Sequence, residues 1–324
     1  MSKQTIDTVA VIGVGLLGGS LGLALKKNGL AGRVIGVARR SETIPTAIEL
    51  GAIDEGSLDP IAAVSQADLV FLATPVLQMP RLLEVIAPAL SANCIVTDTG
   101  SSKENIVEFA AALGIRSFVG GHPMAGSEKK GVAYARPDLF SGRTYFLTPT
   151  AQTDEAALTT VRDLVTGFGA IPVILPPERH DRIVAITSHL PHLLASSLIR
   201  LALATSKVEP LLEKGMATGL RDITRIASGD VEMWRDIYIS NRNHLLEALD
   251  SLEEILAQAR ALLKDGDAPA LAQLLSEAKD FRERVYGAQP GGPAAVAGDS
   301  EPLKSQASSP SEPDRTRAGP KPAK

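Results

Sequence analysis

A glycine-rich turn near the start of the chain restricts its possible folds more than any other feature. The turn reads Gly13-Val14-Gly15-Leu16-Leu17-Gly18 and joins an apolar run at residues 9–12 to an apolar stretch that ends near Leu25. Between a buried strand and a helix, Gly13 permits the tight turn, Gly15 lets the backbone approach a pyrophosphate, and Gly18 lets helix and strand pack closely. Free N–H groups at the helix start, those of Leu16 and Leu17 among them, would bind the phosphates. The pattern therefore predicts a dinucleotide-binding unit, with a ligand-free turn as the alternative.

Short apolar strands alternate with amphipathic helices over the first half of the chain. Strands are expected at residues 34–37, 69–73, 95–97, 118–119, 145–147 and 172–175. The early ones are apolar throughout, which is typical of strands covered by helices on both faces. The sequence thus predicts an α/β fold with a doubly wound, Rossmann-type nucleotide-binding domain over residues 1–175.

The pattern changes near Glu178, where strand-like runs end and helical periodicity begins. Residues 243–263 contain neither Gly nor Pro and keep apolar residues at three- and four-residue spacing. Helices of this length seldom bury all their apolar faces within one chain. We therefore expect an all-helical domain over residues 176–287 that forms a homodimer.

The remaining composition excludes several classes of function. Residues 288–324 are rich in Pro, Ser, Gly and Ala and lack apolar periodicity, which predicts a disordered tail, with a docking peptide as the alternative. The net charge of −4 argues against partners such as nucleic acid or an anionic membrane. Three features indicate a cytoplasmic protein. The chain has a single cysteine, Cys94, which cannot form an internal disulfide; it starts without a signal peptide; and it lacks a membrane-spanning run.

The end of the second strand bears on the choice of dinucleotide. In NAD-binding units an acidic residue about 20 residues past the glycines holds the ribose hydroxyls. Here the strand runs into Arg39, Arg40 and Ser41, with no acid before Glu42. These side chains could bind a 2′-phosphate through charge-assisted hydrogen bonds, so NADP is favoured and NAD is possible. The loop at Thr74 and Pro75, after the next long strand, is expected to cover the cofactor; the alternative is that both arginines are solvated bystanders.

Histidines supply the candidate catalytic groups, and the chain has five of them. His122 lies in a stretch flanked by glycines, which predicts a loop after a strand at the rim of the sheet. Its ordinary pKa near neutrality suits a proton acceptor, and Ser101, on the same rim, could fix its tautomer. A histidine that merely stabilises a turn is the alternative. If His122 is the proton acceptor of an enzyme, activity should rise with pH as His122 loses its proton.

Two further groups of residues are weighed for binding. His189 and His192 share a helix face, but no suitably spaced carboxylate or cysteine completes a metal site, so we expect none. Arg221 and Arg225 lie in the helical region, where an arginine buried against the nucleotide domain would bind a substrate carboxylate. An arginine on a solvated helix would bind nothing.

Five motifs in this order make the chain similar to the prephenate/arogenate dehydrogenase family, the oxidoreductases of tyrosine biosynthesis. They lie at residues 13–20, 97–103, 120–128, 188–192 and 221–227, and the resemblance extends over about residues 7 to 287. The third, from Gly120 through His122 to Glu128, is highly specific. The chain departs from the NAD-type members at Arg39 and Arg40.

The resemblance implies a reaction and a role for each motif. Hydride passes from ring C4 of prephenate or arogenate to the cofactor, the hydroxyl proton passes to His122, and carbon dioxide leaves as the ring becomes aromatic. Ser101 would orient His122, and Arg225 would bind a substrate carboxylate. Further residues implied at the pocket or the domain cleft are His180, His192, Glu128 and Trp234. The choice between prephenate and arogenate stays open.

Two other functions fit parts of the pattern. A 3-hydroxyacid dehydrogenase or imine reductase has the same architecture, but these enzymes typically use a helical-domain lysine, and the nearest here, Lys207 and Lys214, lie in a polar connector. A module that senses a dinucleotide without turnover would not need Ser101, His122 and Arg225 together.

Overall fold

Eight strands form one sheet in the order β3-β2-β1-β4-β5-β6-β7-β8. The structure is a computed structural model that describes residues 5–127 and 129–287. The strands are β1 (Ile6–Ile12), β2 (Ala31–Val37), β3 (Glu55–Ser57), β4 (Leu69–Leu72), β5 (Ile95–Asp98), β6 (Phe118–Pro123), β7 (Thr144–Thr148) and β8 (Ile171–Ile174). All neighbours pair in parallel except β6 and β7. The chain leaves β1 for β2 on one side and returns to β4 on the other, and this reversal is where doubly wound sheets bind ligands.

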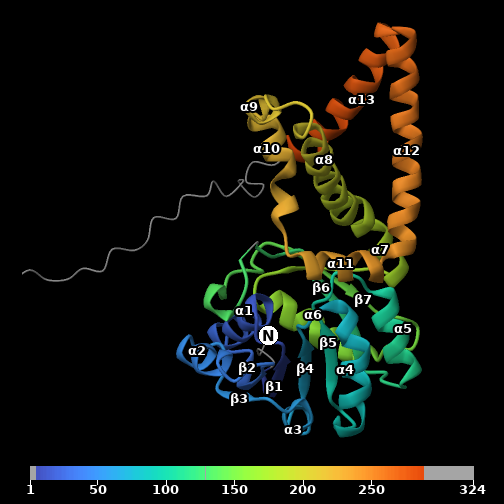
Figure 1. Cartoon of the computed structure of the whole chain (residues 1–324). Helices are drawn as coiled ribbons and strands as arrows, with labels where there is room; N and C mark the ends of the chain where they lie inside the picture. Colours follow the sequence, from blue (N-terminus) through green and yellow to red (C-terminus); the bar gives the residue numbers. More distant parts are fainter. Residues whose placement is uncertain (1–4, 128, 288–324) are drawn as a thin grey trace, which may run out of the picture. The chain divides into compact units, whose positions relative to one another are not determined.

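Helices cover both faces of the sheet, as Figure 1 shows. They are α1 (Leu16–Lys27), α2 (Thr43–Glu49), α3 (Pro60–Val64), α4 (Met79–Ile86), α5 (Glu104–Ala112) and α6 (Glu155–Gly167), with short 3-10 turns η1 (Val76–Gln78), η2 (Ala87–Ala89) and η3 (Val132–Tyr134). Successive residues of β1 point to opposite faces: Val9 and Val11 join the core under α1 and α6, whereas Ala10 and Ile12 join the core under α3, α4 and α5. The doubly wound α/β fold expected from the sequence is confirmed.

The strands expected from apolar runs are all present, but two features differ. β3 was not expected, because its three residues, Glu55 to Ser57, carry no apolar signal. The prediction that His122 lies in a loop is wrong. β6 continues through Pro123, because antiparallel pairing with β7 sets His122 opposite Phe146 and keeps the backbone extended. Local pattern does not predict this strand, because the glycines beside His122 are uncommon in strands.

Residues beyond β8 form helices only, in the described part of the chain. They are α7 (Pro177–Val184), the π-helical turn η4 (Ala185–His189), α8 (Leu190–Ser206), α9 (Leu212–Gly215), α10 (Thr218–Thr224), the 3-10 turn η5 (Arg225–Ser228), α11 (Val231–Ser240), α12 (Arg242–Asp265) and α13 (Ala268–Tyr286). Helix α11 crosses the edge of the sheet at which β1, β4 and β5 end (Figure 1). None of the described helices is long and apolar enough to span a membrane.

The chain divides into two compact units, residues 1–256 and 257–324. The first contains the sheet together with α7 to α11 and the first part of α12. The second contains, among its described residues, the end of α12 and helix α13. The boundaries at 175 and 287 stay predictions, and the tail expected at 288–324 lies outside the described residues.

Candidate active site

The glycine-rich turn has the geometry expected of a phosphate-binding turn. Gly13 has φ of 102°, and a Cβ there would lie 2.5 Å from the carbonyl oxygen of Ala73. A Cβ on Gly18 would lie 2.1 Å from the carbonyl oxygen of Gly13, so only glycine permits this close contact between helix and turn. A Cβ on Gly15 would meet no atom within 4 Å. The space beside Gly15, at the start of α1, can therefore accept a ligand.

The loops after β2 and β4 lie on either side of this turn. Arg39, Arg40 and Ser41 follow β2 directly, and all three are exposed. Thr74 follows β4 and contacts the turn, since its methyl carbon is 3.1 Å from the Cβ position of Gly13. Its Oγ1 is buried and has no hydrogen-bond partner among the described residues. An unpaired buried hydroxyl beside the glycine turn fits a site that a cofactor completes.

His122 lies on β6, next to the end of β5, and its side chain is buried. Its Nδ1 is 2.8 Å from Nε2 of His180, on α7, and the two rings meet edge to face. Ser101 lies in the loop after β5, but His180, not Ser101, is the hydrogen-bond partner of this imidazole in the structure. The sequence therefore located the histidine and its rim without identifying what fixes its ring.

Burial lowers the pKa of His122 well below its usual value of 6.5, and the nearby His180 and the ammonium of Lys103 act in the same direction. Burial also lowers the pKa of His180 to about 2. Both imidazoles are thus neutral near pH 7. A neutral imidazole can accept a proton, which an imidazolium cannot.

A buried ion pair supports the backbone beneath His122. Lys103 and Asp98 have no exposed side-chain surface and contact one another directly. The carboxylate of Asp98 also accepts hydrogen bonds from the N–H groups of Gly121, at 2.9 Å, and Gly100, at 2.7 Å. One carboxylate therefore ties the residue before His122 to the loop that carries Ser101.

Helical residues 189–238 present a second group of aromatic and polar side chains. The ring of His192 stacks on Trp234, with 3.7 Å between centroids, and its Nδ1 is 2.5 Å from the hydroxyl of Tyr238. Trp234 also meets His189 edge to face. Arg225 and Arg221 are both exposed, so the structure does not show the arginine buried against the nucleotide domain that the sequence analysis weighed. Glu128 lies outside the described residues. Among the described residues, no three metal-ligating side chains are grouped to hold an ion.

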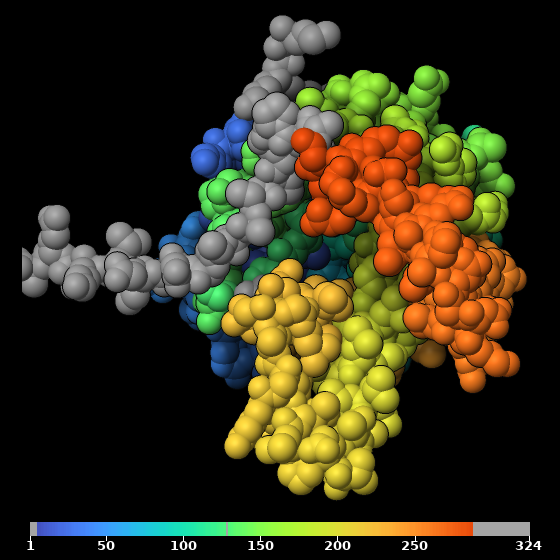
Figure 2. Space-filling model, turned by 90° about the horizontal axis from the view of Figure 1, so that it is seen from above, coloured from blue at the N-terminus to red at the C-terminus, as the bar shows by residue number. Residues whose placement is uncertain are grey.

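Figure 2 looks down on this end of the molecule. Blue-green atoms of the sheet domain are visible at the bottom of a hollow bordered by the olive atoms of α8 and the yellow atoms of α10. Helix α8 carries His192, and η5, with Arg225, follows α10 directly. His192 thus lies on a helix that borders the hollow.

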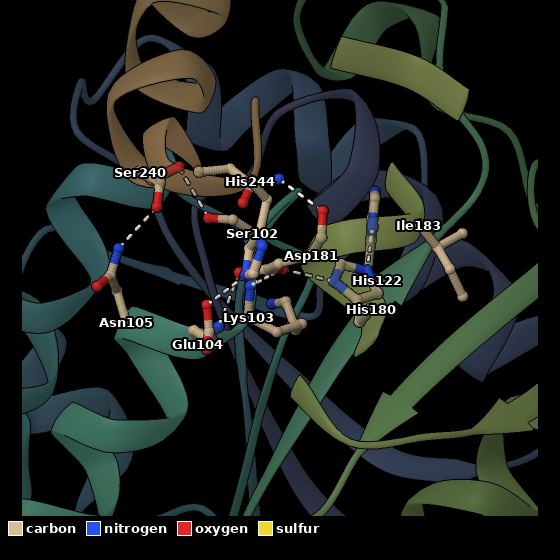
Figure 3. Close-up of polar contacts among 12 residues, drawn as sticks. Ser102, Lys103, Glu104, Asn105, His122, His180, Asp181, Ile183, Ser240 and His244 are labelled. Atoms are coloured by element: carbon tan, nitrogen blue, oxygen red, sulfur yellow. Dashed lines mark hydrogen bonds and ion pairs between the residues drawn. The ribbon is translucent and has the colours of Figure 1, made fainter. Parts of the chain in front are cut away.

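A polar network that the sequence did not reveal joins the start of α5 to α7, α11 and α12 (Figure 3). Asp181 accepts hydrogen bonds from the N–H groups of Lys103 and Glu104. The other contacts are Ser102 Oγ with Ser240 Oγ at 2.8 Å, Asn105 Nδ2 with the Ser240 carbonyl at 2.7 Å, Asn241 Nδ2 with the Asp181 carbonyl at 2.8 Å, and His244 Nε2 with Glu104 at 2.9 Å. The partners are 60 to 140 residues apart in the chain, so no local pattern could have paired them.

Comparison with known proteins adds independent evidence. The family model described as prephenate dehydrogenase, nucleotide-binding domain, matches residues 21–174, and the model described as prephenate dehydrogenase, dimerization domain, matches residues 176–277. Prephenate dehydrogenase from Bacillus subtilis (strain 168) is 39% identical over 284 residues, which is 87% of this chain and 76% of that protein.

Solved structures agree with the family models. Prephenate dehydrogenase from A. aeolicus, in complex with hydroxyphenyl propionate and NAD+, aligns with a TM-score of 0.84 and 34% identity, over 88% of this chain and 100% of that one. Synechocystis arogenate dehydrogenase aligns with a TM-score of 0.77 and 32% identity, over 86% of this chain and 99% of that one.

Proposed function

Because this chain belongs to the prephenate dehydrogenase family, we propose that it catalyses the NAD(P)-dependent oxidative decarboxylation of prephenate, arogenate or both. The products would be 4-hydroxyphenylpyruvate and tyrosine, respectively. One observation carries the proposal: His122 is a buried, neutral imidazole at the same edge of the sheet as a turn built for phosphates. Such an arrangement suits removal of a hydroxyl proton beside a dinucleotide.

His122 is the residue we propose as proton acceptor. It would hydrogen-bond the C4 hydroxyl and take its proton, while loss of carbon dioxide makes the ring aromatic. Ser101, in the loop beside His122, would contact the same hydroxyl or the nicotinamide. Arg225 would bind a carboxylate bidentately. His192 would contact the substrate or form the wall of its pocket, with His180 nearby. A gating contact at the cleft would be made by Glu128, with Trp234 close to it.

The residues around Gly15 fit a dinucleotide. A Cβ at Gly13 or Gly18 would collide with a backbone carbonyl, whereas the space beside Gly15 is open. The buried hydroxyl of Thr74 has no hydrogen-bond partner among the described residues, and a ligand could supply one. The amides of Leu16 and Leu17, at the start of α1, would bind its phosphates, and Pro75 would border it. When bound, the nicotinamide supplies the hydride acceptor that this chemistry needs.

We favour NADP over NAD as the cofactor. The A. aeolicus relative is described with NAD+. In this chain, however, the loop after β2 carries Arg39, Arg40 and Ser41 rather than an acid, and all three side chains are exposed. Two guanidinium groups beside a ribose would attract a 2′-phosphate, and an acid there would repel it.

We further propose a homodimer formed through the helical region, in a cytoplasmic setting. The match to a dimerization domain supports it. So do apolar side chains of this region that are more than half exposed: Leu201, Leu203, Val208, Leu211 and Ile223. Several large apolar side chains left exposed in one region are typical of an interface. The buried free thiol of Cys94 agrees with a reducing compartment.

The test crosses prephenate and arogenate with NAD and NADP and follows absorbance at 340 nm. Turnover with either substrate is expected, and the His122→Asn variant should lose on the order of 10²-fold or more in kcat. No turnover in any combination, with cofactor binding intact, would refute the enzymatic assignment.

Matched arginine variants test the cofactor proposal. Arg39→Ala and Arg40→Ala should each lower kcat/KM for NADP by about tenfold, the value of one charge-assisted hydrogen bond, and leave that for NAD nearly unchanged. Arg33→Ala is the control, because Arg33 lies on β2, the strand that leads into this loop, but pairs with Glu55. Equal rates with both cofactors in the wild type would show that Arg39 and Arg40 are bystanders.

A further inference from the structure

Three buried side chains form a continuous hydrogen-bonded row that ends at His122 (Figure 3). Nδ1 of His122 is 2.8 Å from Nε2 of His180, and Nδ1 of His180 is 2.7 Å from Oδ1 of Asp181. His180 has no exposed surface and Asp181 is 1% exposed. The row joins strand β6 to helix α7, whose residues are far from His122 in the sequence. Because His180 and Asp181 are buried, bulk water does not compete for their hydrogen bonds.

Each side-chain oxygen of Asp181 accepts a hydrogen bond from a backbone N–H group. Oδ1 accepts the backbone N–H of Lys103 at 2.7 Å, and Oδ2 accepts that of Glu104 at 3.0 Å. Burial raises the pKa of Asp181, but these two N–H bonds and the Lys103 ammonium favour the ionised form. A carboxylate without a proton can only accept. His180 must therefore donate to Asp181 from Nδ1.

This donor fixes the order of protons along the whole row. A neutral imidazole carries one N–H, so His180, with its proton on Nδ1, has a lone pair on Nε2. His122 must then donate to that lone pair from Nδ1, which leaves its own Nε2 without a proton. In the opposite order, Nε2 of His122 would carry a proton and could accept none.

We propose that Asp181 is a positioning residue for catalysis: through His180 it holds His122 in the tautomer whose Nε2 is free to accept the hydroxyl proton of the substrate. The proposal rests on the dehydrogenase function proposed above. When the proton arrives, His122 keeps its Nδ1–H bond to His180, so its ring does not rotate. Asp181 touches neither substrate nor cofactor and acts only through His180.

Removing the acceptor at position 181 is expected to release the row, and an amide can reverse it. In Asp181→Asn, an amide nitrogen that faces the N–H of Glu104 leaves the oxygen toward His180, and the wild-type order persists. An amide nitrogen that faces Lys103 N–H and His180 instead donates to Nδ1 of His180, so His180 donates from Nε2 and Nε2 of His122 becomes protonated. Asp181→Leu offers His180 no acceptor, so the order of protons is no longer fixed in that variant. Replacing a carboxylate that orients a catalytic histidine by an amide costs about 10⁴ in kcat where it has been measured. We expect a loss of about 10² to 10⁴ in kcat, with KM changed by less than about threefold.

The decisive measurement is the ¹⁵N chemical shift of the histidine nitrogens in the full-length protein without substrate. Spectra of His122→Gln and His180→Gln assign the two rings among the five histidines. The wild type should show a protonated Nδ1 and a bare Nε2 on both rings, and Asp181→Leu a share of the opposite tautomer on both. A protonated Nε2 on His122 in the wild type overturns the proposal, and this result does not depend on whether the Asp181 variants fold.

Ser240→Ala is the matched structural control. It removes the Ser102–Ser240 contact, another link between α5 and the helical region, and leaves the row intact. It should keep the wild-type tautomers and kcat within about threefold. If Asp181→Leu, which removes the acceptor altogether, keeps both as well, Asp181 does not set the tautomer. Failure of the wild type to oxidise prephenate or arogenate would refute the proposed function alone, because the tautomers are read without turnover.

Discussion

The ammonium of Lys103 and the carboxylate of Asp98 pair inside the protein, where neither side chain reaches solvent. Lys103 precedes α5 directly and Asp98 ends β5, so the pair joins a helix start to a strand end. Asp98 also accepts the N–H of Gly121, the residue before His122. The position of the proposed proton acceptor therefore depends on a charge pair at the end of the neighbouring strand.

Loss of Lys103 alone should destabilise the protein strongly. In Lys103→Met the stem still packs, but the carboxylate of Asp98 stays buried without its cation, which typically costs about 3 to 5 kcal/mol. Lys26→Met is the control, because Lys26 pairs with Asp54 at the surface, where such pairs contribute about 1 kcal/mol or less. Urea unfolding at pH 7 measures both.

The double variant Asp98→Asn/Lys103→Met separates charge from packing. It removes both charges and should recover a large part of the lost free energy of unfolding. If Lys103→Met costs no more than Lys26→Met, the buried pair is not the support described here.

The acid limb of the pH profile should lie well below pH 6.5. His122 accepts a proton only when neutral, and burial lowers its pKa, so the neutral fraction falls only once the pH drops through that lowered value. We therefore expect kcat/KM to stay level across pH 6.5 and to decline at more acid pH, a sharper expectation than a rise through neutrality. A decline centred at or above 6.5 would show that His122 is not held neutral.

The sequence predicted those parts of the site that depend on neighbours along the chain. The glycine turn at residues 13–18 carries its own geometry, and the apolar strands carry their own burial, so both follow from local pattern. The strand at His122 does not, because pairing with Phe146 on β7 makes it. The same holds for Asp181: folding brings it to Lys103 and to the His122–His180 pair, and the only sequence signal was an acid directly after a histidine.

A methyl group on Gly15 should weaken cofactor binding without affecting the fold. Gly15 has φ of −101°, which any residue adopts, and its Cβ would meet no protein atom within 4 Å. The methyl group would instead occupy space that a pyrophosphate approaches, so Kd for the dinucleotide should rise about tenfold or more. Calorimetric titration and a melting curve measure the two effects.

Gly18→Ala provides the contrast, because its Cβ would lie 2.1 Å from the carbonyl oxygen of Gly13. That variant should lower the melting temperature as well as the affinity. A Gly15→Ala protein with wild-type affinity would mean that the phosphates do not bind at this turn.

Gly229→Ala should displace the ring that stacks on His192. Gly229 has an extended backbone, with φ of −63°, that alanine can adopt, but a Cβ there would lie 2.3 Å from Nε1 of Trp234 and 3.3 Å from Nε2 of His192. Overpacking of this kind costs about 1 to 3 kcal/mol, and moving Trp234 would alter the wall of the proposed substrate pocket, so KM should rise with kcat less affected.

Trp234 is the single tryptophan of the chain, so its fluorescence reports the displacement directly. Gly219→Ala is the control, since a Cβ there meets nothing within 4 Å and should change neither fluorescence nor KM. A changed fluorescence with an unchanged KM would remove Trp234 from the substrate pocket and leave it a structural role in the helical region.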